Sequence, residues 1–218
     1  MPDKESEPGR SHYRRYEECG VVYGDGSPER RRPEVELFLS WIPEGARVVD
    51  LACGSGTIAT RIARERNATV SGVEIDPRGV EEAKRRGISA VVGDLDEGIP
   101  FEKDAFDVAV INVSLHMVYR PRFLLEEALR VARQVIVTFP NFGYWLYRVE
   151  LSVFGKFPKH SLYGYSWYDT RHIHLFSLAD LRALCRELGV GITAERFTGL
   201  KNRRESKIAR LAPNLFGR

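Results

Sequence analysis

A carboxylate directly before a glycine-rich turn is the first feature of this sequence with chemical meaning. The stretch ARVVDLACGSGTIATRIARER, residues 46–66, reads as an apolar strand ending near Asp50, a turn with Gly54 and Gly56, and an amphipathic helix. Glycine lets the backbone approach a ligand closely, and the first turn of a helix presents unpaired N–H groups. We therefore expect a ligand to bind at this turn, with Asp50 beside it.

Two classes of cofactor compete for this turn. Residues 54–59 satisfy the pattern GxGxxA, and Glu74 follows about twenty residues later, as a dinucleotide site requires. A dinucleotide, however, brings pyrophosphate, and like unit charges about 5 Å apart repel by roughly 3 kcal/mol at an effective dielectric near 20. S-adenosylmethionine (SAM) brings an ammonium and a sulfonium, which Asp50 would attract. The sign of the charge favours SAM, with an NAD-dependent oxidoreductase as the alternative.

The ends of the next two strands offer further groups for a nucleoside. Glu74, in GVEID, is placed to accept from both ribose hydroxyls. In GDLDEGIPF, Asp94 can accept from the adenine amino group while Leu95 packs on the ring. Asp96 and Glu97 resemble a general acid and base pair, but we expect them to begin a solvated turn.

Histidines supply the candidates for catalysis. His116 follows the fourth expected strand, near the expected position of a methyl acceptor, where it could be catalytic or could cap a loop. The segment WYDTRHIHLF contains Tyr168, His172 and His174, and alternation in an extended chain places the two histidines on one face. A metal site would need a third ligand, so we expect a polar, substrate-facing lining and no metal. Cys53 has no basic neighbour in the sequence, and we expect it to pack.

Alternating strands and helices must position these residues. This pattern, with short connections, predicts a parallel, doubly wound sheet. Strands are expected over 46–52, 68–76, 88–94, 106–114 and 133–141, and helices within 33–45 and over 56–66, 77–87 and 121–132.

The alternation of expected strands and helices ends after residue 141. An aromatic-rich segment, about 142–176, is expected to be an insertion in which Tyr144, Trp145 and Tyr147 pack in a core or a lid. A helix over 177–189 should begin at Ser177 with a capping box, and a sixth strand is expected over 191–199.

The composition of the chain limits the classes of protein to which it can belong. The chain has 218 residues, of which 43% are hydrophobic and 29% charged, as suits one globular domain over 33–218 after an N-terminal arm or lid, 1–32. Three scattered cysteines, no secretory segment and no apolar run of about 20 residues predict a cytoplasmic protein away from membranes. A net charge of +3 is too small to indicate nucleic acid. From Arg196 onward there are seven basic residues and one acid, expected to form a solvated tail or to face an acidic partner.

The motifs VVDLACGSG, GVEID, GDLDEGIPF and FDVAVINVS resemble, in this order, the signatures of class I SAM-dependent methyltransferases over about 33–141. The resemblance implies an α/β fold with a doubly wound, mostly parallel Rossmann-like sheet and an aromatic-rich insertion after the fifth strand. Ala52 stands where that family often has its first loop glycine. The implied cofactor-binding residues are Asp50, Ala52, Cys53, Gly54, Gly56, Glu74, Ile75, Asp94, Leu95 and Asn112.

A narrower resemblance covers the rest of the chain. VTFPNFGYW and WYDTRHIHLFSLADLRALC are similar to the MetW family, named for methionine biosynthesis. This implies binding of SAM or its product S-adenosylhomocysteine, and association with the homoserine O-acyltransferase of that pathway. Two functions follow as alternatives: methyl transfer to a small polar acceptor through a sugar or other hydroxyl, or support of the acyltransferase as a SAM-binding partner. The catalytic candidates are His116, His174 and Tyr168, and a homodimer stays open.

Overall fold

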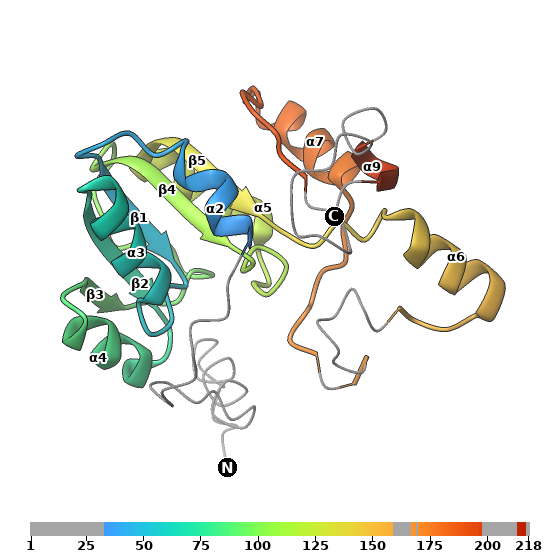
Figure 1. Cartoon of the computed structure of the whole chain (residues 1–218), viewed down its shortest axis with the longest axis horizontal. Helices are drawn as coiled ribbons and strands as arrows, with labels where there is room; N and C mark the ends of the chain where they lie inside the picture. The colour runs from blue at the N-terminus through green and yellow to red at the C-terminus, as the bar shows by residue number, and fades with distance from the viewer. Residues whose placement is uncertain (1–32, 159–166, 169, 198–212, 217–218) are drawn as a thin grey trace, which may run out of the picture. The chain divides into compact units, whose positions relative to one another are not determined.

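The structure of the protein is a computed structural model, which describes residues 33–158, 167–168, 170–197 and 213–216 (Figure 1). The expected arm, 1–32, and most of the basic C-terminal segment lie outside these residues. The described chain divides into two compact units. The first holds Leu39–Asn112 and Phe123–Ile136; the second holds residues 33–38, Val113–Arg122 and the described residues from Val137 onward. The predicted boundaries of the arm and of the insertion stay predictions.

A five-stranded parallel sheet confirms the predicted fold class. Its strand order is β3-β2-β1-β4-β5. The strands are β1 (Arg47–Leu51), β2 (Thr69–Glu74), β3 (Ser89–Val92), β4 (Phe106–Asn112) and β5 (Ala132–Thr138). Central β1 is paired on both sides, in register Asp50 with Gly72 of β2 and with Val110 of β4. Because the strands are parallel, their carboxyl ends meet at one edge of the sheet, where such folds bind ligands.

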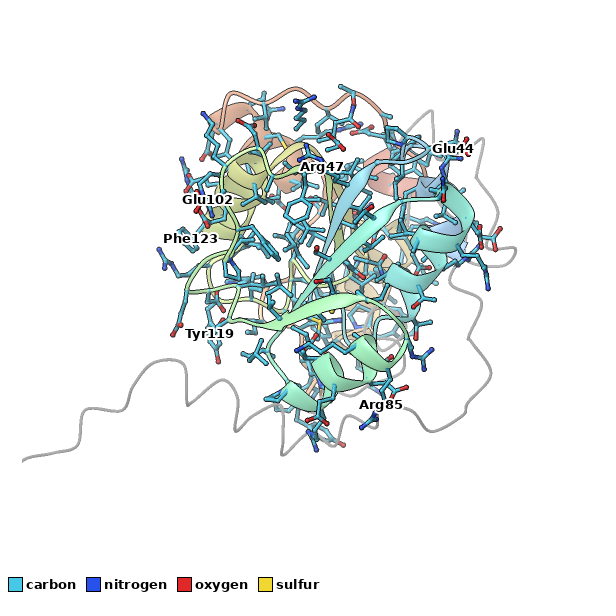
Figure 2. The ribbon with its side chains drawn as sticks, turned by 90° about the vertical axis from the view of Figure 1, so that its left-hand side faces the viewer. Glu44, Arg47, Arg85, Glu102, Tyr119 and Phe123 are labelled. Carbon is cyan, nitrogen blue, oxygen red and sulfur yellow. The ribbon has the colours of Figure 1, made fainter. Side chains whose placement is uncertain are left out.

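Apolar runs hold the sheet in place. Val108, Ala109, Val110 and Ile111 of β4 are all fully buried, as expected for a strand covered on both faces. At the amino ends of the strands, Arg47 anchors β1 to β4: its N–H donates to Asp107 Oδ2 at 2.9 Å, and its guanidinium pairs with the same carboxylate (Figure 2 labels Arg47).

Helices flank the sheet at the predicted places. α3 (Thr57–Arg66) packs on β2, and α4 (Pro77–Arg85) packs on β2 and β3. α4 begins where Pro77 fixes the first helical residue and Asp76 accepts from the Arg78 N–H at 2.9 Å. Helices α2 (Pro33–Leu39) and α5 (Pro121–Val131) complete the predicted alternation.

Besides most of α2, the described part of the second unit contains α6 (Trp145–Phe154), α7 (Leu178–Glu187) and α9 (Pro213–Phe216). The predicted capping box is confirmed, since Ser177 and Asp180 bond reciprocally at the start of α7. Tyr144 and Tyr147 are buried as predicted, whereas Trp145 is 39% exposed.

The predicted sixth strand is wrong over residues 191–197, which form no regular structure. A strand needs a hydrogen-bonded neighbour, and the β-branched residues of this stretch do not supply one. Here Glu195 instead forms an ion pair with Arg182 of α7. Residues 198–199 of the expected strand lie outside the described residues.

Candidate functional site

The glycine loop between β1 and α3 is a tight turn held by β2. The N–H groups of Ala52 and Cys53 both donate to the carbonyl of Val73, at 2.9 and 3.0 Å. Gly54 and Gly56 adopt left-handed backbone angles, with φ of 55° and 75°. Ala52 does so as well, at φ 64°, which costs an L-residue about 1–2 kcal/mol. The loop therefore keeps its shape although its first glycine is replaced.

Two glycines allow close packing around this loop. A Cβ on Gly56 would lie 2.9 Å from the Cβ of Ala83, so only glycine lets the start of α3 approach α4. A Cβ on Gly72 would lie 2.5 Å from the Cys53 sulfur. Gly72 thus makes the space that the Cys53 side chain fills, and Cys53 is buried, in agreement with its predicted packing role.

Two buried carboxylates belong to this loop. Asp50 and Glu74 are 2% and 4% exposed, at the carboxyl ends of neighbouring strands. Glu74 Oε2 accepts from the Gly54 N–H at 2.8 Å, and Oε1 accepts from the Asp76 N–H at 3.1 Å. The Ile75 N–H also acts on this carboxylate, which is therefore fixed in place; with about four lone pairs it can still accept from a ligand.

Burial and negative charge define the electrostatics of the loop. Burial raises the pKa of Glu74, against the lowering effect of N–H donors from Asp76, Gly54 and Ile75. Burial also raises the pKa of the Cys53 thiol, and the charges of Asp50 and Glu74 raise it further. A thiol in such surroundings stays protonated and is no nucleophile. The same surroundings would repel pyrophosphate and attract an ammonium or sulfonium group.

SAM fits this set of donors and acceptors. Asp50 is a buried carboxylate that would attract a cation, and Glu74 is an oriented carboxylate that could accept from a diol. The glycine turn lets a ligand approach the backbone closely. The contacts of SAM with these residues stay a prediction.

The remaining predicted cofactor residues lie near the same edge of the sheet. Asn112 is the last residue of β4, and Ile75 directly follows β2. Asp94 follows β3 and accepts from the Asp96 N–H at 2.9 Å, so the predicted turn after Asp94 is confirmed. Leu95 is buried, at 6% exposure.

The histidines come together in the second unit. The rings of His116 and His172 lie edge to face, with centroids 4.1 Å apart and an interplanar angle of 84°. The His116 carbonyl accepts from the N–H of His174 at 3.1 Å. Tyr168 is 69% exposed and packs edge-on against Trp167.

Sequence reasoning expected His172 in a polar, substrate-facing lining and did not foresee its contact with His116. His172 lies 56 positions from His116, and no local pattern connects the two. The His172 ring contacts His116 and the His174 ring lies by the Tyr119 carbonyl, so both side chains contact the same turn.

The described part of the chain contains neither a metal-binding cluster nor a helix that could span a membrane. No group of three or more His, Cys, Asp or Glu residues there is arranged to hold a metal ion. None of the described helices has the length and apolar character needed to span a membrane. An open hollow of about 370 Å³ lies near Glu44, Asp107 and Arg133, at the amino ends of the strands and so away from the glycine loop.

Comparison with known proteins decides the family. The model of the methionine biosynthesis protein MetW matches residues 32–218. This chain belongs to the MetW family. The bifunctional methionine biosynthesis protein MetXA/MetW of Rhodopirellula baltica is 35% identical over 173 residues, which are 74% of this chain and 28% of that protein. The predicted MetW resemblance is therefore confirmed.

This MetW family member is also similar to methyltransferases. A fatty-acid O-methyltransferase of Mycolicibacterium smegmatis is 36% identical over 56% of this chain and 44% of its own length. The chain thus spans less than half of these curated relatives. A SAM-dependent methyltransferase of Thermotoga maritima superposes with a TM-score of 0.56 at 24% identity, covering 72% of this chain and 69% of that one. This likeness shows the shared fold.

Proposed function

We propose that this MetW family member binds SAM at the glycine loop and transfers its methyl group to a hydroxyl of a small polar acceptor. One observation carries the proposal. Asp50 is a buried carboxylate beside the loop that should hold a nucleoside, and its negative charge suits a sulfonium far better than the pyrophosphate of a dinucleotide, whereas Glu74 would suit the ribose of either.

The chain's own residues have distinct parts in this proposal. Asp50 holds the amino end of the cofactor, Glu74 accepts from its ribose hydroxyls, and Asp94 and Leu95 receive its adenine. When bound, SAM supplies a methyl group that its sulfonium already makes electrophilic. The protein must then orient the acceptor and exclude water.

A comparison of binding partners tests this cofactor assignment. Titration calorimetry with the purified chain is expected to show binding of SAM and S-adenosylhomocysteine, and none of NADH. Mass spectrometry of small molecules that co-purify with the protein gives an independent reading. Binding of NADH without either sulfur nucleoside would overturn the proposal.

His174 is the stronger candidate for the base that activates the hydroxyl. Its Nε2 lies 3.2 Å from the Tyr119 carbonyl, and a carbonyl can only accept. Nε2 is therefore the donor in this contact, and Nδ1 is the ring nitrogen that we propose takes the proton of the acceptor hydroxyl. His116, by contrast, is buried, and burial lowers its pKa to about 3, which makes it a weak base. We propose that Tyr168, the third catalytic candidate, also lies on the side of the site where the methyl acceptor binds.

Substitution of His174 tests this role. His174→Ala is expected to lower kcat about a hundredfold or more with a working acceptor, because a positioned base contributes that much. Its affinity for SAM should stay unchanged, which makes SAM binding the internal control. Full turnover in both His174→Ala and His116→Ala would show that neither histidine serves as the base.

A second function has one specific observation in its favour. In the Rhodopirellula baltica relative, the region similar to this chain is joined to a MetXA part in one polypeptide. We propose as the alternative that this chain supports a homoserine O-acyltransferase and carries SAM or S-adenosylhomocysteine without methylating a substrate. Co-purification with the acyltransferase, together with no methyl transfer to any acceptor pool, would favour this alternative.

A further inference from the structure

Two segments of the second unit meet at His116, and we call this contact the histidine junction. It joins Val113–Arg122 to residues 170–177. The His116 carbonyl accepts from two successive N–H groups, of Ile173 at 2.9 Å and of His174 at 3.1 Å. These two backbone bonds attach residues 170–177 to a residue 57 and 58 positions earlier in the chain.

Two imidazole rings close the junction. His116 is fully buried, and neither of its ring nitrogens has a hydrogen-bond partner among the residues that the structure describes. The His172 ring lies against it, and the Phe142 ring lies edge-on to His172 at 6.0 Å. A ring held in this way is stable only when neutral, because an imidazolium has two N–H donors that need acceptors or water.

The electrostatics agree with this geometry. Burial lowers the pKa of His116 to about 3, with a further contribution from His172, and burial lowers the pKa of His172 to about 4. Among the described residues, no carboxylate contributes to the lowered pKa of either ring. Two other charged or titratable side chains of the joined segments have other partners: Arg122 pairs with Glu187, and His174 contacts the Tyr119 carbonyl.

Release of the rings changes their proton affinity. Once exposed, both imidazoles return toward a pKa of 6.5. The open form therefore binds more protons between about pH 6.5 and pH 4, and the closed form loses stability as the pH falls through this range. Above pH 6.5 both forms are neutral at these rings, and the junction keeps its full stability.

We propose that the histidine junction is an acid-sensitive latch, which holds Val113–Arg122 to residues 170–177 at neutral pH and releases them in acid. The latch does not depend on methyl transfer. Its opening would nevertheless displace His174, the candidate base.

Hydrogen exchange read by mass spectrometry tests the latch in the full chain. After correction for the intrinsic rate, protection of peptides covering 113–122 and 170–177 is expected to fall about tenfold or more between pH 7.5 and about pH 5. Protection of β1 and β4 should persist over the same range. An equal loss in β1 and β4 would mean global acid unfolding and would overturn the proposal.

Variants separate the rings from the rest of the junction. The double variant His116→Phe/His172→Phe keeps an edge-to-face pair that cannot take a proton, so its junction should stay closed at about pH 5. His174→Gln removes a neighbouring imidazole and should keep the wild-type response. An NMR titration of the wild-type histidine rings needs no variant: His116 should gain its proton at the same pH at which protection is lost. Protonation of His116 with full protection would contradict the latch, as would acid opening of the double variant.

Discussion

Replacing Glu74 by glutamine is expected to weaken the binding of SAM about a hundredfold, which corresponds to about 2.7 kcal/mol. The Glu74 carboxylate accepts from the N–H groups of Gly54 and Asp76, and the Ile75 N–H also acts on it; a carboxylate has about four lone pairs, so capacity remains for a ribose hydroxyl. The amide of glutamine has only one acceptor oxygen. Its NH₂ group would face either an N–H of the loop or a ligand hydroxyl, and charge-assisted hydrogen bonds of about 1.5–3 kcal/mol each would be lost.

Calorimetry with SAM and with S-adenosylhomocysteine measures this loss. The matched control is Glu65→Gln on α3, because Glu65 forms an exposed i,i+4 ion pair with Arg61 and lies outside the glycine loop. A thermal melt without ligand shows whether Glu74→Gln still folds. If a folded Glu74→Gln variant binds SAM as tightly as wild type, Glu74 has no part in holding the nucleoside.

Asn141→Ala is expected to destabilise the second unit by about 3 kcal/mol. Asn141 is 4% exposed, and its Oδ1 accepts from the N–H groups of Gly143 and Leu178, at 3.0 and 3.1 Å. Its Nδ2 lies 3.4 Å from the carbonyls of Pro213 and Asn214, at the start of α9. Alanine would leave two buried N–H groups without this acceptor, at about 1–3 kcal/mol each.

Close packing around Gly143 leaves little room for the structure to replace the hydrogen bonds that Asn141→Ala would remove. A Cβ on Gly143 would lie 2.7 Å from Asn214 Oδ1 and 2.9 Å from Ser177 Cβ, so the turn after Asn141 already packs against the starts of α7 and α9. Figure 1 shows α7 and α9 beside each other, and contacts between them agree. One side chain thus joins three segments that are distant in sequence.

Urea unfolding combined with region-specific hydrogen exchange measures the effect. Protection of α7 should fall in Asn141→Ala, while β1 and β4 of the first unit should keep theirs. Asn141→Asp is the comparison variant: it retains Oδ1 for both N–H donors beside the N-terminus of α7, but its second oxygen would face the carbonyls of Pro213 and Asn214, so α7 should keep its protection while the contact with α9 is lost. Wild-type protection of α7 in Asn141→Ala would show that this amide does not hold the unit together.

Local patterns predicted those parts of the protein that local interactions determine. The run of apolar residues in β4, the Pro77 start of α4 and the capping box at Ser177 each lie within a few residues of chain, and each was found as predicted. The failed strand over 191–197 shows the limit of this reasoning. A strand depends on a neighbouring strand that the stretch itself does not contain. The buried side of α6 likewise depends on residues that are distant in the sequence.

By itself, the sequence determined the parallel sheet, the glycine loop with Asp50 and Glu74, and the membership of the MetW family. The sheet and the loop follow from residue periods and spacings, which act over a turn or a strand, whereas the family follows from the resemblance of whole motifs such as VTFPNFGYW. Only the tertiary structure decided that His116 meets His172, that Glu74 is held by the loop's own N–H groups, and that Asn141 joins α7 to α9. The physical reason is that these contacts link positions 20 to 73 residues apart, where chain folding, and no local preference, brings the atoms together.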